Sequence, residues 1–498
     1  DGNCQRISDA YQKSLKEDVD LVIFSELSIT GYSPEDLLHK NYFIKAVEEK
    51  IEELCQLTKN QNSAILVGAP ASFTNKNGQK LLYNAVFLIE NGDIKAIIRK
   101  VTLPNYSIFD EERYFEKSPY LSDVNFRGFN LAIIICEDMW DEKNAFLLSC
   151  RKIDAVLSIS ASPFSQRKSQ KRIEVAKSFI KDIKKPLIYI NQIGAQDSVV
   201  FDGRSFTMDD KGNVNFMMKD FEEDSSIVEL QKNDEIINII PPEIKNDSDQ
   251  DDIMEKIYKA IILGVSDYVR KNGFDKVILG LSGGIDSALV AIIAADALGS
   301  DKVKLVALPS RYNSQSSMDD ALKLADNLEN KLDIISIEEM FKAANQTLSK
   351  EFENTEINIA EENMQSRIRG LILMAISNKF SHLLLSTGNK SENAVGYATL
   401  YGDMCGAFNP LKDIYKSEVF KLAKWRNNNI PNISIFKKKN IIPQNIITKA
   451  PTAELRHNQK DSDSLPEYEI LDQILFNLIE EEKSVAEIIK LGFAKEMV

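Results

Sequence analysis

Short runs of apolar and β-branched residues recur through the first half of the chain, and polar or turn-forming residues separate them. Such runs are typical of buried strands. Apolar positions three and four residues apart predict helices between several of these strands, at residues 42–57 and 171–183. The predicted strands are residues 19–24, 64–68, 83–89, 94–100, 131–136, 155–160 and 187–191. This alternation predicts an α/β fold for the first half.

The second half repeats the order strand, helix, strand. Its predicted strands are residues 276–281, 304–308, 332–337 and 383–386. Its predicted helices are residues 253–271, 286–298, 317–328 and 363–380, and further helices beyond Lys416 are interrupted by a loop over residues 427–451. Consecutive strand–helix–strand units predict a mostly parallel sheet.

A polar, acidic stretch with two prolines separates the halves. It runs from Lys232 to Asp252 and contains Pro241-Pro242, followed by Asn246-Asp-Ser-Asp-Gln-Asp-Asp252. This composition is typical of a linker. We therefore predict one domain over residues 1–231, a linker over residues 232–252 and a second domain over residues 253–498.

The length agrees with this division, and the charge restricts the partners. A chain of 498 residues has room for two or three domains at roughly 100–200 residues each. With 61 Lys and Arg against 75 Asp and Glu, the net charge is −14, so no electrostatic attraction draws the chain to nucleic acid or an anionic membrane. No apolar run approaches the roughly 20 residues that span a bilayer. We therefore expect neither nucleic-acid nor membrane partners.

The sequence offers few thiols and fewer histidines. The five cysteines are scattered and lack CxxC spacing, which argues against a disulfide framework and favours a reducing, cytoplasmic location. With three histidines, a histidine-based triad or a multi-histidine metal site is disfavoured. Carboxylates, lysines, thiols and nucleotides remain as carriers of chemistry.

A turn with two adjacent glycines, Gly280-Leu-Ser-Gly-Gly-Ile-Asp-Ser287, joins a predicted strand to a predicted helix. Backbone N–H groups and the helix dipole at such a junction can bind phosphate oxygens. Asp286 beside phosphate requires a cation between them, which Mg²⁺ would supply. The turn lacks the Gly-Lys-Ser/Thr of a Walker A loop. The alternative is a tight strand-to-helix turn that binds no ligand.

This turn is similar to the phosphate-binding loop of the ATP pyrophosphatases, the adenine nucleotide alpha hydrolase type. The resemblance implies a Rossmann-like parallel sheet and the formation of an adenylate with release of pyrophosphate. Five further motifs resemble the NAD synthetase family: Leu385-Ser-Thr-Gly-Asn-Lys-Ser-Glu392, Glu362-Asn-Met-Gln-Ser-Arg-Ile-Arg-Gly370, Tyr401-Gly-Asp-Met-Cys405, Asp413-Ile-Tyr-Lys416 and Ala450-Pro-Thr-Ala-Glu-Leu455.

The resemblance implies roles for individual residues of the second half. Deamido-NAD is expected to contact Asn363, Arg367 and Glu392, and Asp286 and Glu392 would share Mg²⁺. The residues expected to contact ATP are Gly280, Leu281, Ser282, Gly283, Gly284, Ile285, Asp286, Ser287, Thr387, Lys416 and Thr452.

Several of these residues also have a plain structural alternative. Asn363 and Arg367 are four residues apart and could simply cap and solvate one helix face. Lys416 could be a surface lysine, and Thr387-Gly388 could be an ordinary strand end.

Three chemically active residues stand at or just beyond predicted strand ends in the first half, where α/β sites usually lie. Together, Glu26, Lys100 and Cys136 could hydrolyse an amide: Glu26 takes the thiol proton, Cys136 attacks the carbonyl carbon and Lys100 stabilises the oxyanion. The charge of Lys100 would also favour the thiolate. The alternative for Cys136 is a small buried apolar residue.

The segments around these residues resemble the nitrilase-like amidohydrolases. The resemblance implies an α-β-β-α sandwich with Glu26, Lys100 and Cys136 as its catalytic triad. It also implies that residues 196–203 lie near the site, and that glutamine is held by Tyr106, Glu137, Ser162 and Lys168. The segments that carry it are Phe24-Ser-Glu-Leu-Ser-Ile-Thr-Gly-Tyr32, Arg99-Lys-Val-Thr-Leu-Pro-Asn-Tyr106, Phe109-Asp-Glu-Glu-Arg-Tyr-Phe115 and Cys136-Glu-Asp-Met-Trp140.

Together the halves resemble the glutamine-dependent NAD synthetase family. This implies that glutamine is hydrolysed to ammonia, which amidates deamido-NAD through an ATP-derived adenylate, in a homo-oligomer (dimer to octamer) with a passage for ammonia. By the same resemblance, Asp1-Gly2-Asn3 corresponds to a turn after a first strand, and a Glu-Tyr-Lys-Arg segment is expected beyond Val498. Two alternatives stay open: an ATP pyrophosphatase amidotransferase with a different acid substrate, and a regulator that binds glutamine or nucleotide without catalysis.

Overall fold

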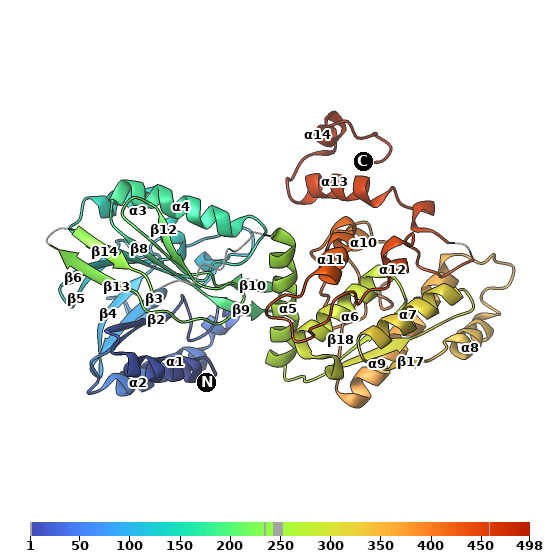
Figure 1. Cartoon of the computed structure of the whole chain (residues 1–498), viewed down its shortest axis with the longest axis horizontal. Helices are drawn as coiled ribbons and strands as arrows, with labels where there is room; N and C mark the ends of the chain where they lie inside the picture. The colour runs from blue at the N-terminus through green and yellow to red at the C-terminus, as the bar shows by residue number, and fades with distance from the viewer. Residues whose placement is uncertain (1, 234–235, 243–251, 458) are drawn as a thin grey trace. The chain divides into compact units, whose positions relative to one another are not determined.

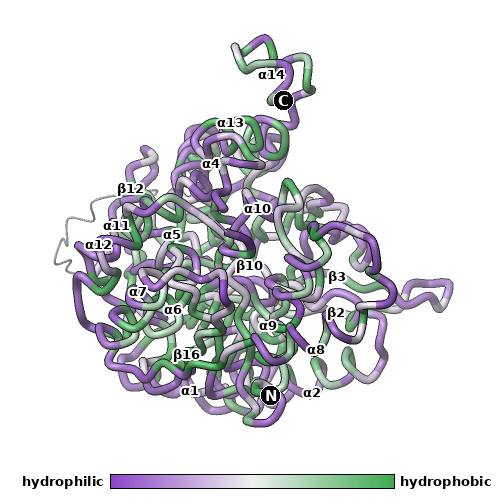
Figure 2. Tube along the Cα trace, turned by 90° about the vertical axis from the view of Figure 1, so that its right-hand side faces the viewer, coloured by the Kyte–Doolittle hydropathy of each residue, from purple (hydrophilic) through white to green (hydrophobic). Residues whose placement is uncertain are grey.

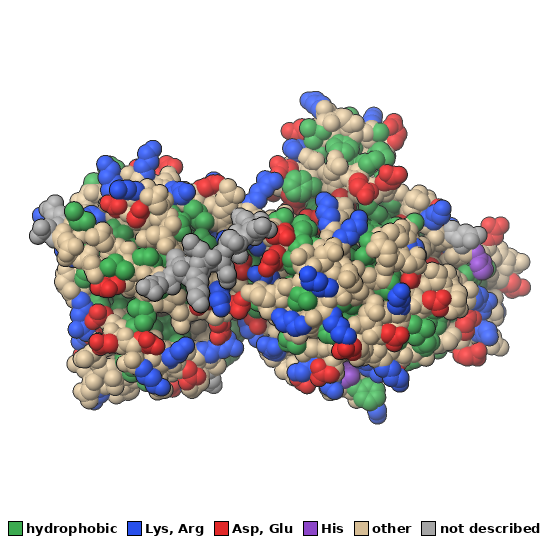
Figure 3. Space-filling view, viewed as in Figure 1, with side chains coloured by type: hydrophobic (Ala, Val, Ile, Leu, Met, Phe, Trp, Pro, Cys, Tyr) green, Lys and Arg blue, Asp and Glu red, His purple; other side chains and the backbone are tan. Residues whose placement is uncertain are grey.

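The computed structural model describes residues 2–233, 236–242, 252–457 and 459–498. The chain forms two compact units, one up to residue 251 and the other from Asp252 onward. Among the described residues, no helix is both long and apolar enough to span a membrane. On the face seen in Figure 3, acidic and basic side chains are interspersed in each unit rather than separated by sign.

Two large sheets form the layers of the first unit, and its described residues also contain two hairpins. The first has the order β1-β2-β3-β4, in which β1 is parallel to β2 and the other pairs are antiparallel. Its strands are β1 (Leu21–Ile23), β2 (Ala64–Thr74), β3 (Lys80–Glu90) and β4 (Asp93–Arg99). The second sheet has the order β12-β11-β8-β7-β6-β5, with parallel pairs at its centre. Its strands are β5 (Ser122–Phe126), β6 (Phe129–Ile135), β7 (Ala155–Ser160), β8 (Leu187–Asn191), β11 (Phe206–Met208) and β12 (Val214–Met217).

The two sheets pack face to face and carry helices on their outer faces. Leu66 and Val86 of the first sheet share one buried cluster with Ile133 and Leu157 of the second. Helices α1 (Gly2–Ser14) and α2 (Asn41–Thr58) cover the first sheet, and α3 (Glu142–Ser149) and α4 (Lys168–Ile183) cover the second (Figure 1). These layers confirm the predicted α-β-β-α sandwich.

The second unit contains one parallel sheet with the order β17-β16-β15-β18. Its strands are β15 (Val277–Gly280), β16 (Val303–Ala307), β17 (Leu332–Ile334) and β18 (Leu383–Leu384). One face packs against α5 (Ile253–Lys271), α6 (Ile285–Leu298), α7 (Gln315–Asn327) and α11 (Lys416–Asn428). The other face packs against α8 (Glu338–Leu348) and α9 (Ile359–Phe380). The Rossmann-like parallel sheet is thus confirmed.

The central helix of this unit explains where its core lies. Every residue of α6 except Asp286 is buried, and the helix and the neighbouring β16 lie among hydrophobic segments in Figure 2. A helix that is apolar on all sides must be covered on all sides.

The remaining α-helices of this unit are α10 (Lys390–Ala394), α12 (Gln444–Thr448), α13 (Tyr468–Ile479) and α14 (Val485–Lys490).

Two expectations about local structure were wrong, and part of the predicted linker contains strands. Gly2 and Asn3 belong to α1 rather than to a turn, because Cys4, Ile7 and Tyr11 bury one helix face; Asp1 lies outside the described residues. The first part of the predicted linker forms a hairpin of β13 (Glu229–Asn233) and β14 (Ile236–Ile240). The predicted loop over residues 427–451 contains α12, which buries two isoleucines.

Candidate active sites

The structure brings Glu26 and Lys100 together beyond the ends of β1 and β4 in the first unit. Lys100 follows β4 directly, and its Nζ lies 2.6 Å from Oε1 of Glu26. The other carboxylate oxygen of Glu26 accepts the backbone N–H of Ala161 at 2.9 Å. Glu26 is fully buried and Lys100 is 1% exposed, so their interaction is shielded from water.

A second glutamate, to which we assigned no role from the sequence, completes this cluster. Oε1 of Glu111 lies 2.8 Å from Nζ of Lys100 and accepts the hydroxyl of Tyr32 at 2.8 Å. Asn84 donates to both Glu26 and Glu111, at 2.7 and 3.3 Å. Burial alone would lower the pKa of Lys100, but the charges of Glu111 and Glu26 raise that pKa well above its usual value. Lys100 is therefore a fixed ammonium between two carboxylates.

Cys136 stands at the first turn after β6, in a left-handed backbone conformation with φ of +46°. Burial raises the pKa of its thiol well above the usual range, the Glu26 charge raises it further and Lys100 opposes both. The charge of Lys100 therefore favours the thiolate, as expected, but burial and the Glu26 charge outweigh it and favour the neutral thiol. Such a nucleophile needs a base, and Glu26 is the fully buried carboxylate that raises the pKa of this thiol most strongly.

Asp138 holds the turn that carries the nucleophile. Its Oδ2 accepts the N–H of Ile135 at 2.9 Å, and its Oδ1 accepts those of Val101 and Thr102 at 3.0 and 2.7 Å. The same carboxylate thus joins the cysteine turn to the segment that follows Lys100. Burial raises the pKa of Asp138 to about 7.

The residues predicted to hold glutamine lie on the segments around Cys136. The Tyr106 hydroxyl donates to Glu137 at 3.0 Å, and burial raises the pKa of Glu137. Nζ of Lys168 lies 4.3 Å from the ring centre of Trp140, a partner that the sequence did not indicate. Ser162 is 2% exposed. These side chains offer an acceptor, a cation and hydroxyls, which suit an amino acid ligand.

Residues 196–203 form part of a second hairpin in this unit, made of β9 (Ile193–Gln196) and β10 (Val199–Asp202). The N–H of Phe164 donates to the carbonyl of Val200 at 2.7 Å, which ties the hairpin to the segment that follows Ser162.

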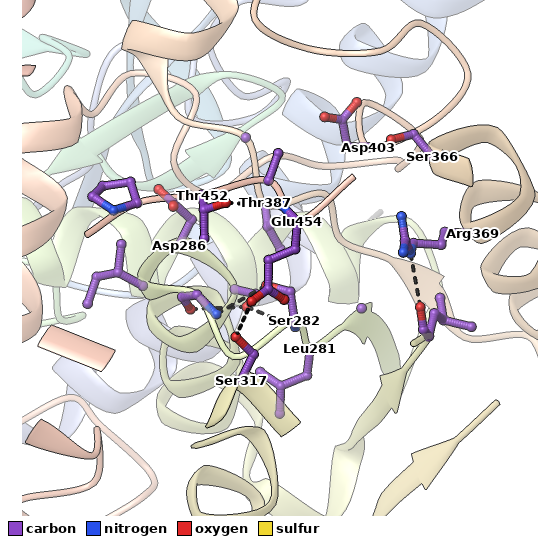
Figure 4. A pocket seen from close by; sticks show the side chains of 18 of the residues that line it. Leu281, Ser282, Asp286, Ser317, Ser366, Arg369, Thr387, Asp403, Thr452 and Glu454 are labelled. Carbon is purple, nitrogen blue, oxygen red and sulfur yellow. Dashed lines mark hydrogen bonds between the residues drawn. The ribbon is translucent and has the colours of Figure 1, made fainter. Parts of the chain in front are cut away.

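In the second unit, the glycine turn borders a cavity of about 280 Å³ at the carboxyl ends of the parallel strands (Figure 4). Gly283 adopts φ of +80°, and its carbonyl accepts Nζ of Lys449 at 3.2 Å. The hydroxyls of Ser282 and Ser287 lie 3.0 Å apart, and Ser282 accepts the N–H of Gly284 at 3.2 Å. Predicted residues that line the cavity are Gly280, Leu281, Ser282, Gly284, Ile285, Asp286, Ser287, Thr387, Glu392, Lys416 and Thr452.

Lys416 bridges the two carboxylates that were predicted to share Mg²⁺. Its Nζ lies 2.6 Å from Asp286 and 2.9 Å from Glu392, and the residue is 3% exposed. A surface role for Lys416 is therefore excluded. Burial and the charge of Asp286 raise the pKa of Glu392 to about 7, although the Lys416 ammonium opposes this.

The cavity also contains a cation that the sequence did not single out. Arg369 donates to the carbonyl of Leu308 at 2.9 Å, and burial lowers its pKa to about 10. Within the residues that the structure describes, no carboxylate lies within ion-pair distance of Arg369, so its charge is available to an anionic ligand. Figure 4 shows Arg369 across the cavity from Asp286 and Thr452.

Asn363 and Arg367, predicted to contact deamido-NAD, do not line this cavity. Asn363 accepts the hydroxyl of Thr399 at 2.8 Å, and Nε of Arg367 donates to the carbonyl of Leu400 at 3.2 Å. Both therefore contact the loop that follows α10. Because Arg367 and Arg369 are two residues apart on one helix, they point to different sides.

Each half of the chain matches one protein family. Residues 1–235 match the carbon-nitrogen hydrolase family, and residues 257–498 match the NAD synthase family. The two matches fall on the sandwich and on the parallel-sheet unit respectively.

Relatives match along the whole chain. The chain is 40% identical to the glutamine-dependent NAD(+) synthetase of Acinetobacter baylyi and 38% identical to that of Thermotoga maritima, over its full length and 88% and 89% of those proteins. It also superposes on the structure of the glutamine-dependent NAD+ synthetase from Acinetobacter baumannii in complex with ADP, with a TM-score of 0.81, 36% identity and coverage of 100% of this chain and 88% of that chain. Both the sequence of the two halves and their folds thus place the chain among the glutamine-dependent NAD(+) synthetases.

Proposed function

We propose that this chain hydrolyses glutamine in its first unit and uses the ammonia to convert deamido-NAD to NAD in its second. The observation that carries the proposal is the combination, in one chain, of a buried Glu26–Lys100 pair beside Cys136 and a glycine turn that lines a cavity with Asp286 and Glu392. A regulator without catalysis would not need to bury these charges. Glutamine-dependent release of AMP in the presence of deamido-NAD tests the proposal.

The glutaminase reaction follows from the charges around the thiol. Glu26 accepts the thiol proton as Cys136 attacks the amide carbon, and the oxyanion forms beside the ammonium of Lys100. The proton then passes to the leaving ammonia, which leaves a thioester on Cys136. Glu26 next activates water, and hydrolysis of the thioester releases glutamate.

The synthetase reaction uses the glycine turn. The nicotinate carboxylate of deamido-NAD attacks the α-phosphorus of ATP, pyrophosphate leaves, and ammonia displaces AMP from the adenylate. Without ligand, the N–H and hydroxyl of Ser282 contact the hydroxyl of Ser287. With ATP bound, the N–H groups of the turn and these two hydroxyls would bind phosphate oxygens instead. Because the chain has a net charge of −14, the positive charge that attracts the phosphates must come from residues of the cavity. Arg369 and Lys416 supply this charge.

The residues of the cavity fit Mg²⁺. Asp286 and Glu392 bind the same ammonium, so both carboxylates face one point. Among the described residues, no group of three or more Asp, Glu, His or Cys could bind a metal. A site with one or two carboxylates that relies on phosphate oxygens for its other ligands is typical of Mg²⁺. Asp286 and Glu392 would hold this ion, which screens charge on the departing pyrophosphate.

Replacement of Glu111 by Gln should impair the glutaminase alone. The change removes one of the two charges that hold the Lys100 ammonium and turns an amide N–H₂ toward Asn84, itself a donor. We expect kcat for glutamate release to fall roughly 10–100-fold, because a displaced Lys100 no longer meets the oxyanion. Glutamine-to-glutamate conversion measures this effect, and NAD formation from ammonium should stay at the wild-type rate. An unchanged kcat would assign Glu111 no part in the site.

We further propose a homo-oligomer in which α9 contributes to the interface. Apolar side chains are exposed along this helix and the loop that Arg367 contacts, including Leu371 at 59%, Leu400 at 61% and Tyr401 at 79%. Exposed apolar surface of this extent is typical of a protein interface. Because most oligomers are built from identical chains, we assign this surface to contact with a second copy of the chain.

Replacement of Leu371 by Glu tests this interface. Burial of an unpaired carboxylate should weaken association by about 3 kcal/mol, roughly a hundredfold in Kd, which sedimentation velocity measures. Leu322→Glu on α7, where the leucine is 40% exposed, is the control and should leave the oligomer intact. Equal behaviour of the two variants would exclude α9 from the interface.

The acid substrate follows from the family of the second unit. A nicotinate dinucleotide is favoured over another acid because the chain matches the NAD synthase family over its second unit. The five cysteines are free thiols, which suits a reducing cytoplasm. A direct path for ammonia would prevent its protonation in bulk water.

A further inference from the structure

One buried side chain, Asn191, holds both backbone polar groups of Ser162. Asn191 ends β8 and is 6% exposed. Its Oδ1 accepts the N–H of Ser162 at 2.8 Å, and its Nδ2 donates to the carbonyl of Ser162 at 3.1 Å. Ser162 therefore cannot shift or rotate without breaking both hydrogen bonds in a site where water cannot replace them.

The backbone segment that Asn191 holds also positions the base. Ala161, which precedes Ser162, donates its N–H to Oε2 of Glu26 at 2.9 Å. Oε1 of Glu26 is already engaged by two other donors, so Ala161 determines where the second oxygen lies. A shift of the backbone of Ala161 and Ser162 would move the base and the Ser162 side chain together.

Two further contacts hold the side chain of Asn191 in place. Its Nδ2 lies 3.0 Å from the carbonyl of Gly203 and 3.4 Å from Oδ1 of Asp202. The same Oδ1 lies 2.5 Å from Nη2 of Arg172, and Asp202 and Arg172 are each 1% exposed. Arg172 belongs to α4, the helix that begins at Lys168. The network thus links Asn191 to α4, the helix that carries Lys168, another residue predicted to hold glutamine.

We propose that Asn191 is a positioning residue of the glutaminase site, which places the base Glu26 and the glutamine contact Ser162 through the backbone of Ala161 and Ser162. The proposal rests on the proposed glutaminase function. It predicts an effect on the chemical step, because Glu26 acts on the thiol proton, in addition to any effect on glutamine binding.

Two replacements separate this role from a general loss of stability. Asn191→Asp keeps the size and the acceptor for the Ser162 N–H but removes the donor to its carbonyl. Asn191→Ser removes the clamp without adding a carboxylate beside Asp202. For both variants we expect kcat for glutamate release to fall roughly 10–100-fold, as for a small displacement of a catalytic group. Ser162→Ala should mainly raise KM for glutamine.

The chain contains a matched control. Asn427, 9% exposed and in the second unit, holds Ile442 in the same way: its Nδ2 donates to the carbonyl at 2.8 Å and its Oδ1 accepts the N–H at 2.9 Å. Asn427→Asp and Asn427→Ser repeat the chemical changes away from the glutaminase residues. They should alter thermal unfolding but leave kcat for glutamate release unchanged.

The outcomes distinguish the inference from the function on which it rests. If the wild-type protein releases no glutamate, the glutaminase function is wrong. If the wild-type protein does, and folded Asn191 variants retain its kcat or show only a raised KM, the positioning role is wrong while the function stands. If Asn191→Asp fails to fold, Asn191→Ser alone decides.

Discussion

Replacement of Cys136 by Ala should abolish NAD formation from glutamine and leave NAD formation from ammonium intact. The thiol of Cys136 is the proposed nucleophile that forms the covalent intermediate, and its replacement leaves Glu26 and Lys100 without a thiol to activate. Because a nucleophile and its base work together, loss of the nucleophile alone lowers kcat for glutamine hydrolysis by at least about 10⁴-fold. The measurement is the rate of NAD formation with each nitrogen donor in turn.

A second cysteine provides the control for this replacement. Cys150 is exposed at the end of α3, so Cys150→Ala should behave as the wild type with both donors. The ammonium reaction of Cys136→Ala shows that the second unit is folded and active. Substantial glutamine-dependent activity in Cys136→Ala would remove Cys136 from the mechanism.

Replacement of Gly283 by Ala should reduce NAD formation from both donors roughly a hundredfold. A Cβ on Gly283 would lie 2.1 Å from the backbone oxygen of Ser317, a contact that neither residue can relieve by rotating a side chain. The φ of +80° adds strain of roughly 1–2 kcal/mol for a residue with a side chain. The turn must therefore move, and a shift of about 1 Å in a positioning loop costs roughly a hundredfold. Release of AMP measures the loss.

Gly273 separates backbone strain from displacement of the turn. It has a similar φ of +76°, but no atom lies within 4 Å of the Cβ that alanine would add. Gly273→Ala should therefore lose some stability and keep the synthetase activity. Glutamine hydrolysis, measured without ATP, should persist in Gly283→Ala, and equal synthetase activity in the two variants would contradict a phosphate-binding role for the turn.

The sequence predicted the regular core well because burial there follows local patterns. The boundaries of α5, β7 and β8 agree with the predicted ranges at both ends, because β7 and β8 are largely apolar strands and the apolar residues of α5 recur at helical spacing. Glu26, Lys100 and Cys136 could be singled out because each stands near the end of such a strand. Helix α1 was missed because only Cys4, Ile7 and Tyr11 bury its inner face while its other residues are mostly polar.

Residues whose role depends on distant contacts could not be predicted. Glu111 is an ordinary acidic residue in sequence, and its role appears only when folding places it 2.8 Å from Lys100. Arg369 and Arg367 occur in one motif, yet helix geometry alone decides that Arg369 faces the cavity. Asn191 ends a strand like many asparagines, and only its contacts with Ser162 distinguish it.

The central claim is that one chain moves the amide nitrogen of glutamine onto deamido-NAD. Glutamine labelled with ¹⁵N at the amide, supplied with ATP, Mg²⁺ and deamido-NAD, tests it by mass spectrometry of the product. We predict NAD that carries the label in its carboxamide, with AMP and glutamate formed in equal amounts to NAD. Glutamate release without labelled NAD, or no reaction with either glutamine or ammonium, would contradict the account.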